Sequence, residues 1–169
     1  MSDFKTNLND NRLAEEAAHG LDGVIDKTDP KHSKHLYGLV AQYEDIDAGG
    51  IVYHSTYLNF AERARSALLR ASKFDVQYWL AEENQGFVIT HIETDYLSPA
   101  KLHNRLIVET SCLQLGGASA LLQQNINSFD RGHIFARVMV KAAWVDIETG
   151  PRKFPEPLQA VLRSFQPAV

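Results

Sequence analysis

The second half of the chain carries a repeating pattern that few folds can accommodate. From Gly86 to Asp146, apolar and polar residues alternate with a period of two, as side chains do along a half-buried strand. Glycine-containing pairs at 116–117 and 131–132 interrupt the alternation, as tight hairpin turns do. The pattern predicts four long strands in an antiparallel meander, at 87–97, 104–115, 118–129 and 133–146.

One long helix is expected ahead of these strands. Small and apolar residues recur at helical spacing between residues 56 and 72, and Ser55 suits the N-cap position. A strand is expected from Leu36, a short helical turn after Phe74, and a final helix from Pro157. The fold class is therefore α+β, with one long central helix wrapped by a curved antiparallel sheet of about five strands. Its exposed sheet edges predict a homodimer or homotetramer.

The first 35 residues differ from the rest. They are polar and lack periodicity, apart from a short helix expected near residues 13–18. We interpret 1–35 as a polar N-terminal extension that is partly disordered or lies on the surface, and 36–169 as the domain. The spacing of His19, His32 and His35 favours solvated side chains, so no metal site is predicted.

Composition excludes several classes of protein. The formal net charge of −4 argues against a nucleic-acid partner, which requires a clustered basic excess. No apolar run approaches the ~18 residues of a membrane span, so no stable membrane insertion is expected. The first residues carry acids and no apolar core segment, which predicts a cytoplasmic protein without a signal peptide. The single cysteine, Cys112, lies in an apolar run and is interpreted as a core residue.

The segment from Tyr43 to Arg65 is rich in residues that could take part in catalysis. Three acids, Glu44, Asp45 and Asp47, precede the pair Gly49-Gly50 and then the expected helix start. The free backbone N–H groups of a helix start can stabilise an oxyanion, and a nearby carboxylate can act as nucleophile or general base. That combination is what acyl transfer requires. The residues alone do not rank the three acids.

The same segment closely resembles the active-site motif of the hydroxybenzoyl-CoA thioesterase family. It is most similar to the branch of acyl-CoA thioesterases associated with the Tol-Pal envelope system, and departs from its pattern at Ile46, Ile51, Ser55, Thr56 and Ala61. The resemblance covers about residues 36–163. It implies the hotdog fold and hydrolysis of an acyl-CoA, or of an acyl-ACP, without a cofactor or metal.

The resemblance also assigns roles. It places the catalytic carboxylate on Asp47 and the contact to the thioester carbonyl on the backbone N–H of His54. Asp47 could attack the thioester directly or activate a water, and both routes stay open. The His54 imidazole either takes part in the reaction or only packs beside it. The substrate-binding residues predicted around this site are Gly49, Gly50, Tyr53 and Tyr57.

The phosphates of CoA require basic groups near the site. The candidates are Arg152 and Lys153, in the stretch GPRKFPEPL, together with Arg131 and Lys141. By resemblance, the substrate lies at a subunit interface, with strand residues near 91–96 supplied by the second chain. Two alternatives remain: a hotdog hydratase or dehydratase acting on acyl thioesters, and a non-catalytic acyl-CoA-binding module. The acyl chain length stays open.

Overall fold

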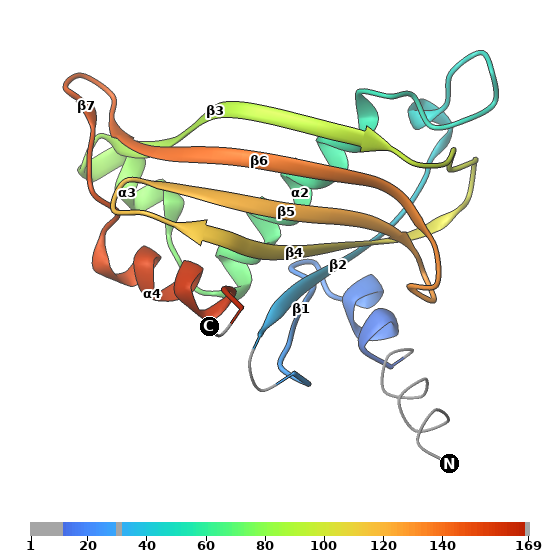
Figure 1. Ribbon diagram of the computed structural model, residues 1–169, viewed down its shortest axis with the longest axis horizontal. Coiled ribbons are helices and arrows are strands. Elements are labelled where there is room, and N and C mark those ends of the chain that lie inside the picture. Colours follow the sequence, from blue (N-terminus) through green and yellow to red (C-terminus); the bar gives the residue numbers. More distant parts are fainter. Residues whose placement is uncertain (1–11, 30–31, 168–169) are drawn as a thin grey trace.

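The computed structural model describes residues 12–29 and 32–167 and shows one antiparallel sheet with its helices on one face (Figure 1). The α+β class is confirmed. The five long strands expected are present, and two short ones, β1 and β7, extend the sheet to seven. The elements in chain order are β1 (Val24–Asp26), β2 (Lys34–Val40), η1 (Tyr43–Asp45), α2 (Thr56–Ala71), α3 (Val76–Glu82), β3 (Gln85–Tyr96), β4 (Arg105–Leu115), β5 (Ser119–Ser128), β6 (Ile134–Asp146), β7 (Gly150–Pro151) and α4 (Glu156–Ser164).

The strand order corrects the predicted meander. The sheet runs β1-β2-β4-β5-β6-β3, so β3 pairs with β6 at one edge, and β4 pairs with β2. Only β4, β5 and β6 form a meander, through the two glycine-containing turns. Alternation reports which face of a strand is buried, but not which strand lies next to it, so the crossover after β3 was invisible in the sequence.

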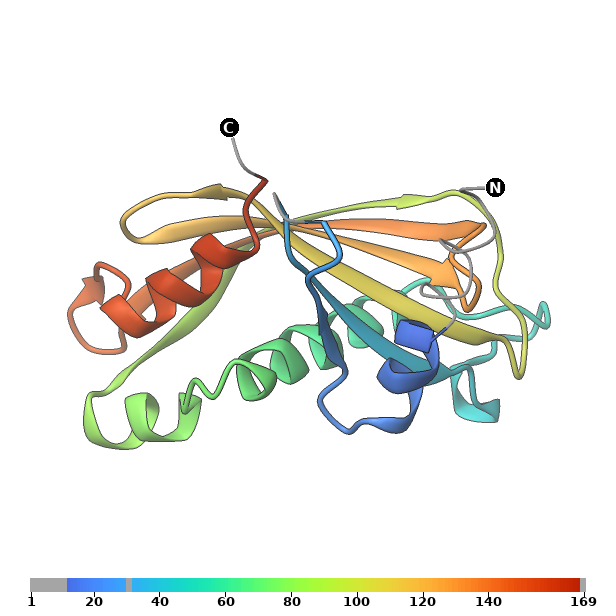
Figure 2. The same cartoon turned by 90° about the horizontal axis from the view of Figure 1, so that it is seen from below.

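The long helix α2 packs against the concave face of the sheet, as Figure 2 shows. Phe60, Ala61 and Ala64 are fully buried there against strands β4 and β6. The small side chains of Ala61 and Ala64 let the helix backbone approach the sheet closely, and the larger Phe60 fills the space beside them. α4 covers the other end of the same face, where Leu158 and Phe154 pack on Trp144.

One polar network crosses this interface. Arg65 donates a hydrogen bond of 2.7 Å to Oε1 of Gln124, which is fully buried, and Arg65 also pairs with Glu62. The Gln124 amide in turn donates to the carbonyl of Ala61 at 2.9 Å. The Glu62–Arg65 pair therefore continues into the core through Gln124.

Cys112 is a core residue, as predicted. It is fully buried, and burial raises the pKa of its thiol to about 11. A thiol that holds its proton so firmly is a poor nucleophile at neutral pH.

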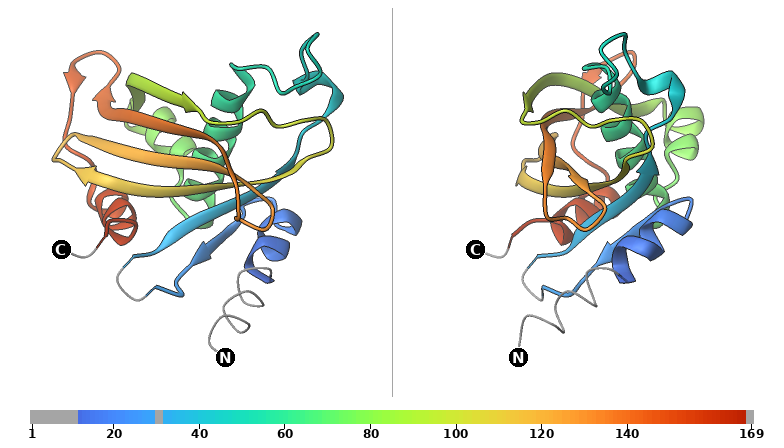
Figure 3. Two further views of the ribbon diagram at one scale, coloured as in Figure 1. Left: turned by 45° about the vertical axis from the view of Figure 1, so that its right-hand side comes forward. Right: turned by 90° about the vertical axis from the view of Figure 1, so that its right-hand side faces the viewer.

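The N-terminal segment is more ordered than expected. Residues 12–19 are helical, and β1 pairs with β2, so regular structure begins well before Leu36 (Figure 3). The helix confirms the prediction near residues 13–18. Residues 1–11 lie outside the described residues, and the domain boundary at residue 35 stays a prediction.

His35 is the clearest correction in this segment. It was expected in solvent, but its side chain is fully buried, with Nε2 2.7 Å from the carbonyl of Asp22. Burial lowers its pKa. Among the described residues, no group of three or more potential ligands could hold a metal ion.

Strand β3 lies at the edge of the sheet, and its outer side pairs with no other strand of the described chain. Several apolar side chains along it are substantially exposed, at Val88, Ile89, Ile92 and Tyr96. An edge strand of twelve residues with exposed apolar side chains is a surface that proteins usually cover. No helix in the described part of the chain is long and apolar enough to span a membrane.

Candidate active site

The turn that carries Asp47 is folded tightly on itself. The Asp47 carboxylate, through Oδ1, accepts hydrogen bonds from the backbone N–H groups of Gly49 at 2.7 Å and Ile51 at 3.5 Å. Gly50 closes the turn with a φ of +78°, a conformation that side chains disfavour. Among the described residues, the Asp47 Oδ2 atom has no hydrogen-bond partner, so it is the oxygen left to act on a ligand.

The three acids that the residues alone left unranked have different surroundings in the structure. Asp45 is 5% exposed, and its carboxylate accepts the backbone N–H of Gln42 at 2.7 Å, which gives it a structural function. Glu44 is exposed, and no interaction within the described chain holds its carboxylate. Asp47 lines a pocket at the start of α2.

Three segments form this pocket, which we call the Asp47 pocket. Asp47, Ile51 and Val52 line one side, His54 and Tyr57 at the start of α2 line another, and residues 96–99 at the end of β3 complete it. The loop after β3 is held against the Asp47 turn, because the N–H of Val52 donates to the carbonyl of Ala100 at 2.9 Å. Segments far apart in sequence thus meet at one end of the sheet.

The start of α2 leaves backbone donors free, as expected of a helix N-terminus. Ser55 occupies the N-cap position, but its side chain makes no capping hydrogen bond. Within the described chain, no acceptor is found for the backbone N–H of His54. The His54 ring is exposed and lies 4.3 Å, centroid to centroid, from the ring of Tyr53. It makes no hydrogen bond within the same residues, so the geometry leaves both interpretations of His54 open.

Tyr57 lies deeper in the same pocket. Its hydroxyl oxygen accepts the backbone N–H of Ala100 at 3.0 Å, and its side chain is almost completely buried. Burial raises the pKa of this hydroxyl, which therefore keeps its proton at neutral pH. That proton is available to a ligand, because the oxygen acts as acceptor towards Ala100.

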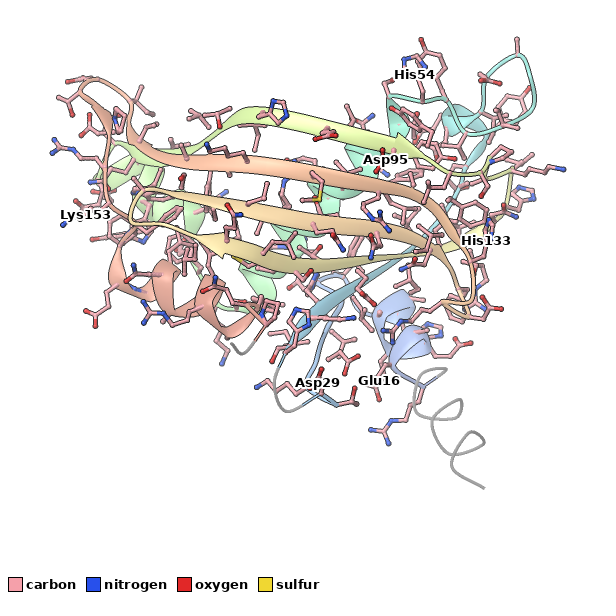
Figure 4. All side chains as sticks on the ribbon, viewed as in Figure 1. Glu16, Asp29, His54, Asp95, His133 and Lys153 are labelled. Atoms are coloured by element: carbon pink, nitrogen blue, oxygen red, sulfur yellow. The ribbon has the colours of Figure 1, made fainter. Side chains whose placement is uncertain are left out.

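The basic candidates lie elsewhere. Figure 4 shows Lys153 and His54 at opposite ends of the sheet, so one chain does not bring Arg152 and Lys153 to the Asp47 pocket. Arg131 is not available either: it pairs with Glu109 at 2.7 Å, and its side chain is only 17% exposed. Tyr53 is about half exposed beside His54 and does not line the pocket.

Sequence reasoning missed Leu97, Ser98 and Pro99, and it assigned the strand residues near 91–96 to a second chain. In the structure Tyr96 of the same chain lines the Asp47 pocket. The dipeptide Ser98-Pro99 ends a strand, but only the pairing of β3 with β6 shows that this end lies beside the start of α2. A second pocket, more apolar, lies farther along α2, between Leu69, Phe87, Ile89 and Leu162.

A long helix held against one curved antiparallel sheet is the architecture of the hotdog fold. Residues 41–162 match the model of the thioesterase-like superfamily, and the chain belongs to that superfamily. The chain is 40% identical over 125 residues to an acyl-CoA thioesterase, YbgC, of Haemophilus influenzae, a match that covers 73% of this chain and 90% of the relative.

Solved structures agree with this assignment. A probable thioesterase from Bartonella henselae superimposes with a TM-score of 0.67 at 30% identity, covering 72% of this chain and 99% of that one. A 1,4-dihydroxy-2-naphthoyl-CoA thioesterase from Synechocystis superimposes with a TM-score of 0.72 at 19% identity, covering 77% and 96%. At that identity the second likeness bears on the fold alone.

Proposed function

We propose that the protein hydrolyses acyl-CoA thioesters in the Asp47 pocket, giving a free carboxylate and the CoA thiol. The observation that carries the proposal is the position of the Asp47 carboxylate, which faces the start of α2 across one pocket. The named activity of the Haemophilus influenzae relative supports the same substrate class. Cytoplasmic location stays part of the proposal.

In this proposal the helix start receives the thioester carbonyl. The free N–H of His54 would stabilise the negative charge that develops on the oxygen, as preorganised donors do in acyl transfer. The protonated hydroxyl of Tyr57 lines the same pocket and can donate to the same substrate. Gly49 and Gly50 leave the approach to Asp47 free of side chains.

Asp47 then supplies the chemistry through Oδ2. As general base it takes a proton from water, whose oxygen attacks the carbonyl carbon while the C–S bond breaks and the thiolate leaves. As nucleophile it attacks the carbonyl carbon itself, the C–S bond breaks and the CoA thiolate leaves, and water then cleaves the mixed anhydride to give the carboxylate and free Asp47. Both routes consume one water and give the same products, and both predict a large loss of activity in an Asn variant.

The alternatives fit less well. A hydratase or dehydratase needs a histidine working with an acid, but no carboxylate in the described chain contacts the His54 ring. A non-catalytic binding module has no use for a carboxylate beside a thioester carbonyl. Neither alternative accounts for Asp47.

The exposed β3 edge supports a homodimer as part of the proposal. A two-fold axis through antiparallel β3 strands would set the Tyr96 end of one strand beside the Gln85 end of its partner. Gln85 pairs with Asp146, and the N–H of Arg152 donates to the carbonyl of Trp144, so the basic pair lies near that end. The partner's basic pair would thereby come towards the Asp47 pocket and meet the CoA phosphates.

The test is release of free thiol from a series of acyl-CoAs, with wild type, Asp47→Asn and Glu44→Gln in parallel. Asp47→Asn should lower kcat by about 100-fold or more, the usual effect of losing a general base. Glu44→Gln is the matched control, because that acid is exposed and unbound, and it should keep wild-type kcat. Equal rates for all three proteins would refute the assignment.

A further inference from the structure

Tyr96 makes a contact that the proposed reaction does not itself require. Its hydroxyl donates a hydrogen bond of 3.0 Å to the backbone carbonyl of His54, the residue before the N-cap of α2. The two residues come from different elements: Tyr96 ends the edge strand β3, and His54 lies just before helix α2. Figure 4 shows the end of β3, marked by Asp95, close to His54.

The ring of Tyr96 is fixed by its surroundings, although half of the residue is exposed. It packs edge-on against the ring of Tyr57, with centroids 5.8 Å apart. Its backbone pairs with Ala136 of β6, and the next two N–H groups, of Leu97 and Ser98, both donate to the carbonyl of Phe135. The hydroxyl is therefore presented from a rigid sheet, and not from a mobile loop.

The turn that receives this hydrogen bond is also held by two backbone hydrogen bonds, from the N–H of Thr56 to the carbonyl of Tyr53 at 2.9 Å and from the N–H of Tyr53 to the carbonyl of Asp45 at 2.8 Å, but neither involves the His54 carbonyl. Within the described chain, the Tyr96 hydroxyl is the sole donor found on the His54 carbonyl, and the side chain of Ser55 makes no cap. The bond fixes the peptide plane between His54 and Ser55. The N–H of Ser55 lies in that plane, and the N–H of His54 lies in the peptide plane just before it, so holding the His54 carbonyl orients the first donor directly and restrains the second through the His54 Cα.

We propose that Tyr96 is a positioning residue, which holds the His54 carbonyl so that the start of α2 meets the thioester carbonyl in a fixed geometry. This inference rests on the proposed thioesterase function and adds a residue to it. Because the thioester carbonyl is common to all acyl-CoA substrates, the effect of Tyr96 is independent of the acyl chain. Because the geometry matters most when negative charge develops, the effect falls on kcat more than on KM.

The test is Tyr96→Phe, which removes the hydroxyl and keeps the ring. We expect kcat to fall about tenfold, as for loss of one hydrogen bond of typical strength, with KM within about twofold of wild type. The loss should be the same for short and long acyl-CoAs. The matched control is Tyr78→Phe, because Tyr78 is 48% exposed against 51% for Tyr96 and its hydroxyl donates one hydrogen bond, to Glu83.

Thermal unfolding and the pH dependence of kcat complete the test. Both should match wild type in Tyr96→Phe, since the hydrogen bond lies at the surface and the ring contacts persist. A rise in KM at constant kcat would show that the hydroxyl binds substrate directly, and would overturn the inference. So would wild-type kcat in Tyr96→Phe. If Asp47→Asn is inactive while Tyr96→Phe is normal, only the Tyr96 inference fails; if Asp47→Asn is fully active, the proposed function fails first.

Discussion

The carboxylate of Asp45 accepts a 2.7 Å hydrogen bond from the backbone N–H of Gln42 and thereby closes the turn that leads into the active-site segment. The carbonyl of the same residue accepts the N–H of Tyr53 at 2.8 Å, which ties this turn to the approach of α2. Two residues further on, Asp47 keeps one carboxylate oxygen free. Adjacent acids thus divide into one that shapes the loop and one that faces the pocket.

Replacing Asp45 by Ala should cost stability, because the backbone N–H of Gln42 loses its acceptor in a partly buried hydrogen bond. We expect a loss of about 1–2 kcal/mol in the free energy of unfolding, measured by urea denaturation. Asp45→Asn retains an acceptor oxygen and should lose less. Asp47→Asn should show the reverse pattern, with activity lost and stability kept; a stable Asp45→Ala protein would contradict the capping interpretation.

Replacing both Arg152 and Lys153 by Gln should raise KM for acyl-CoA about tenfold and leave kcat unchanged. The reason is that basic side chains in contact with the CoA phosphates stabilise the bound substrate and the transition state equally. The difference from wild type should shrink at high salt, which screens exposed charges. Lys141→Gln is the control, because this exposed lysine alternates with the buried Val140 and Ala142 and so faces away from α2.

Mixing subunits tests whether the partner supplies those charges. Asp47→Asn subunits refolded with the Arg152→Gln/Lys153→Gln double variant should yield heterodimers with one intact site, and therefore some turnover at wild-type KM. If each active site were built from one chain alone, every site in the mixture would carry one of the two defects, and no turnover at wild-type KM would appear. The mass of the assembly in solution, measured by light scattering, gives the oligomeric state directly.

Acidification should weaken the docking of the N-terminal segment on the domain. The pKa of His35 is lowered by burial, with Asp22 and Arg70 as the charged groups that act on it, so the unfolded chain binds the proton more tightly. The contribution to stability is therefore full above pH 6.5 and is lost as the pH falls towards the folded-state pKa, by up to about 1.4 kcal/mol per pH unit. Unfolding free energies at pH 7.5, 6 and 5 measure it. His35→Gln should flatten this dependence, whereas His19→Gln, at an exposed site, should leave it unchanged.

Gly38→Ala should push the helical residues 12–19 off the sheet. A Cβ at position 38 would come within 2.5 Å of the Cα of Ala18, and backbone cannot yield as a flexible side chain can. We expect a loss of about 1–3 kcal/mol in stability and faster proteolysis within residues 12–29. Gly117→Ala, where a Cβ meets nothing within 4 Å, serves as control. Equal proteolysis of both variants would show that the packing against Gly38 does not hold the segment.

The positions of the helices and strands were predictable because they depend on residues that are neighbours in sequence. Helical spacing located α2 to within one residue of its C-terminal end, and alternation located the four long strands. The order of the N-terminal segment was underestimated, because it depends on contacts with residues that are not its neighbours in sequence. The buried face of this segment is small, with Ala14 and Ala17 packed on Leu36 and Ile107, and His35 contacts the carbonyl of Asp22, so the periodic signal in the sequence is weak.

By itself, the sequence determined the fold class and indicated one segment as the candidate site, since periodicity and a dense motif are both local properties of the chain. Only the tertiary structure decided which of three neighbouring acids faces a pocket, because the answer depends on which carboxylate the backbone consumes in its own turn. It also decided that Tyr96 meets His54, forty-two residues earlier. That meeting follows from β3 pairing with β6, a long-range register that the alternation of side chains leaves undetermined.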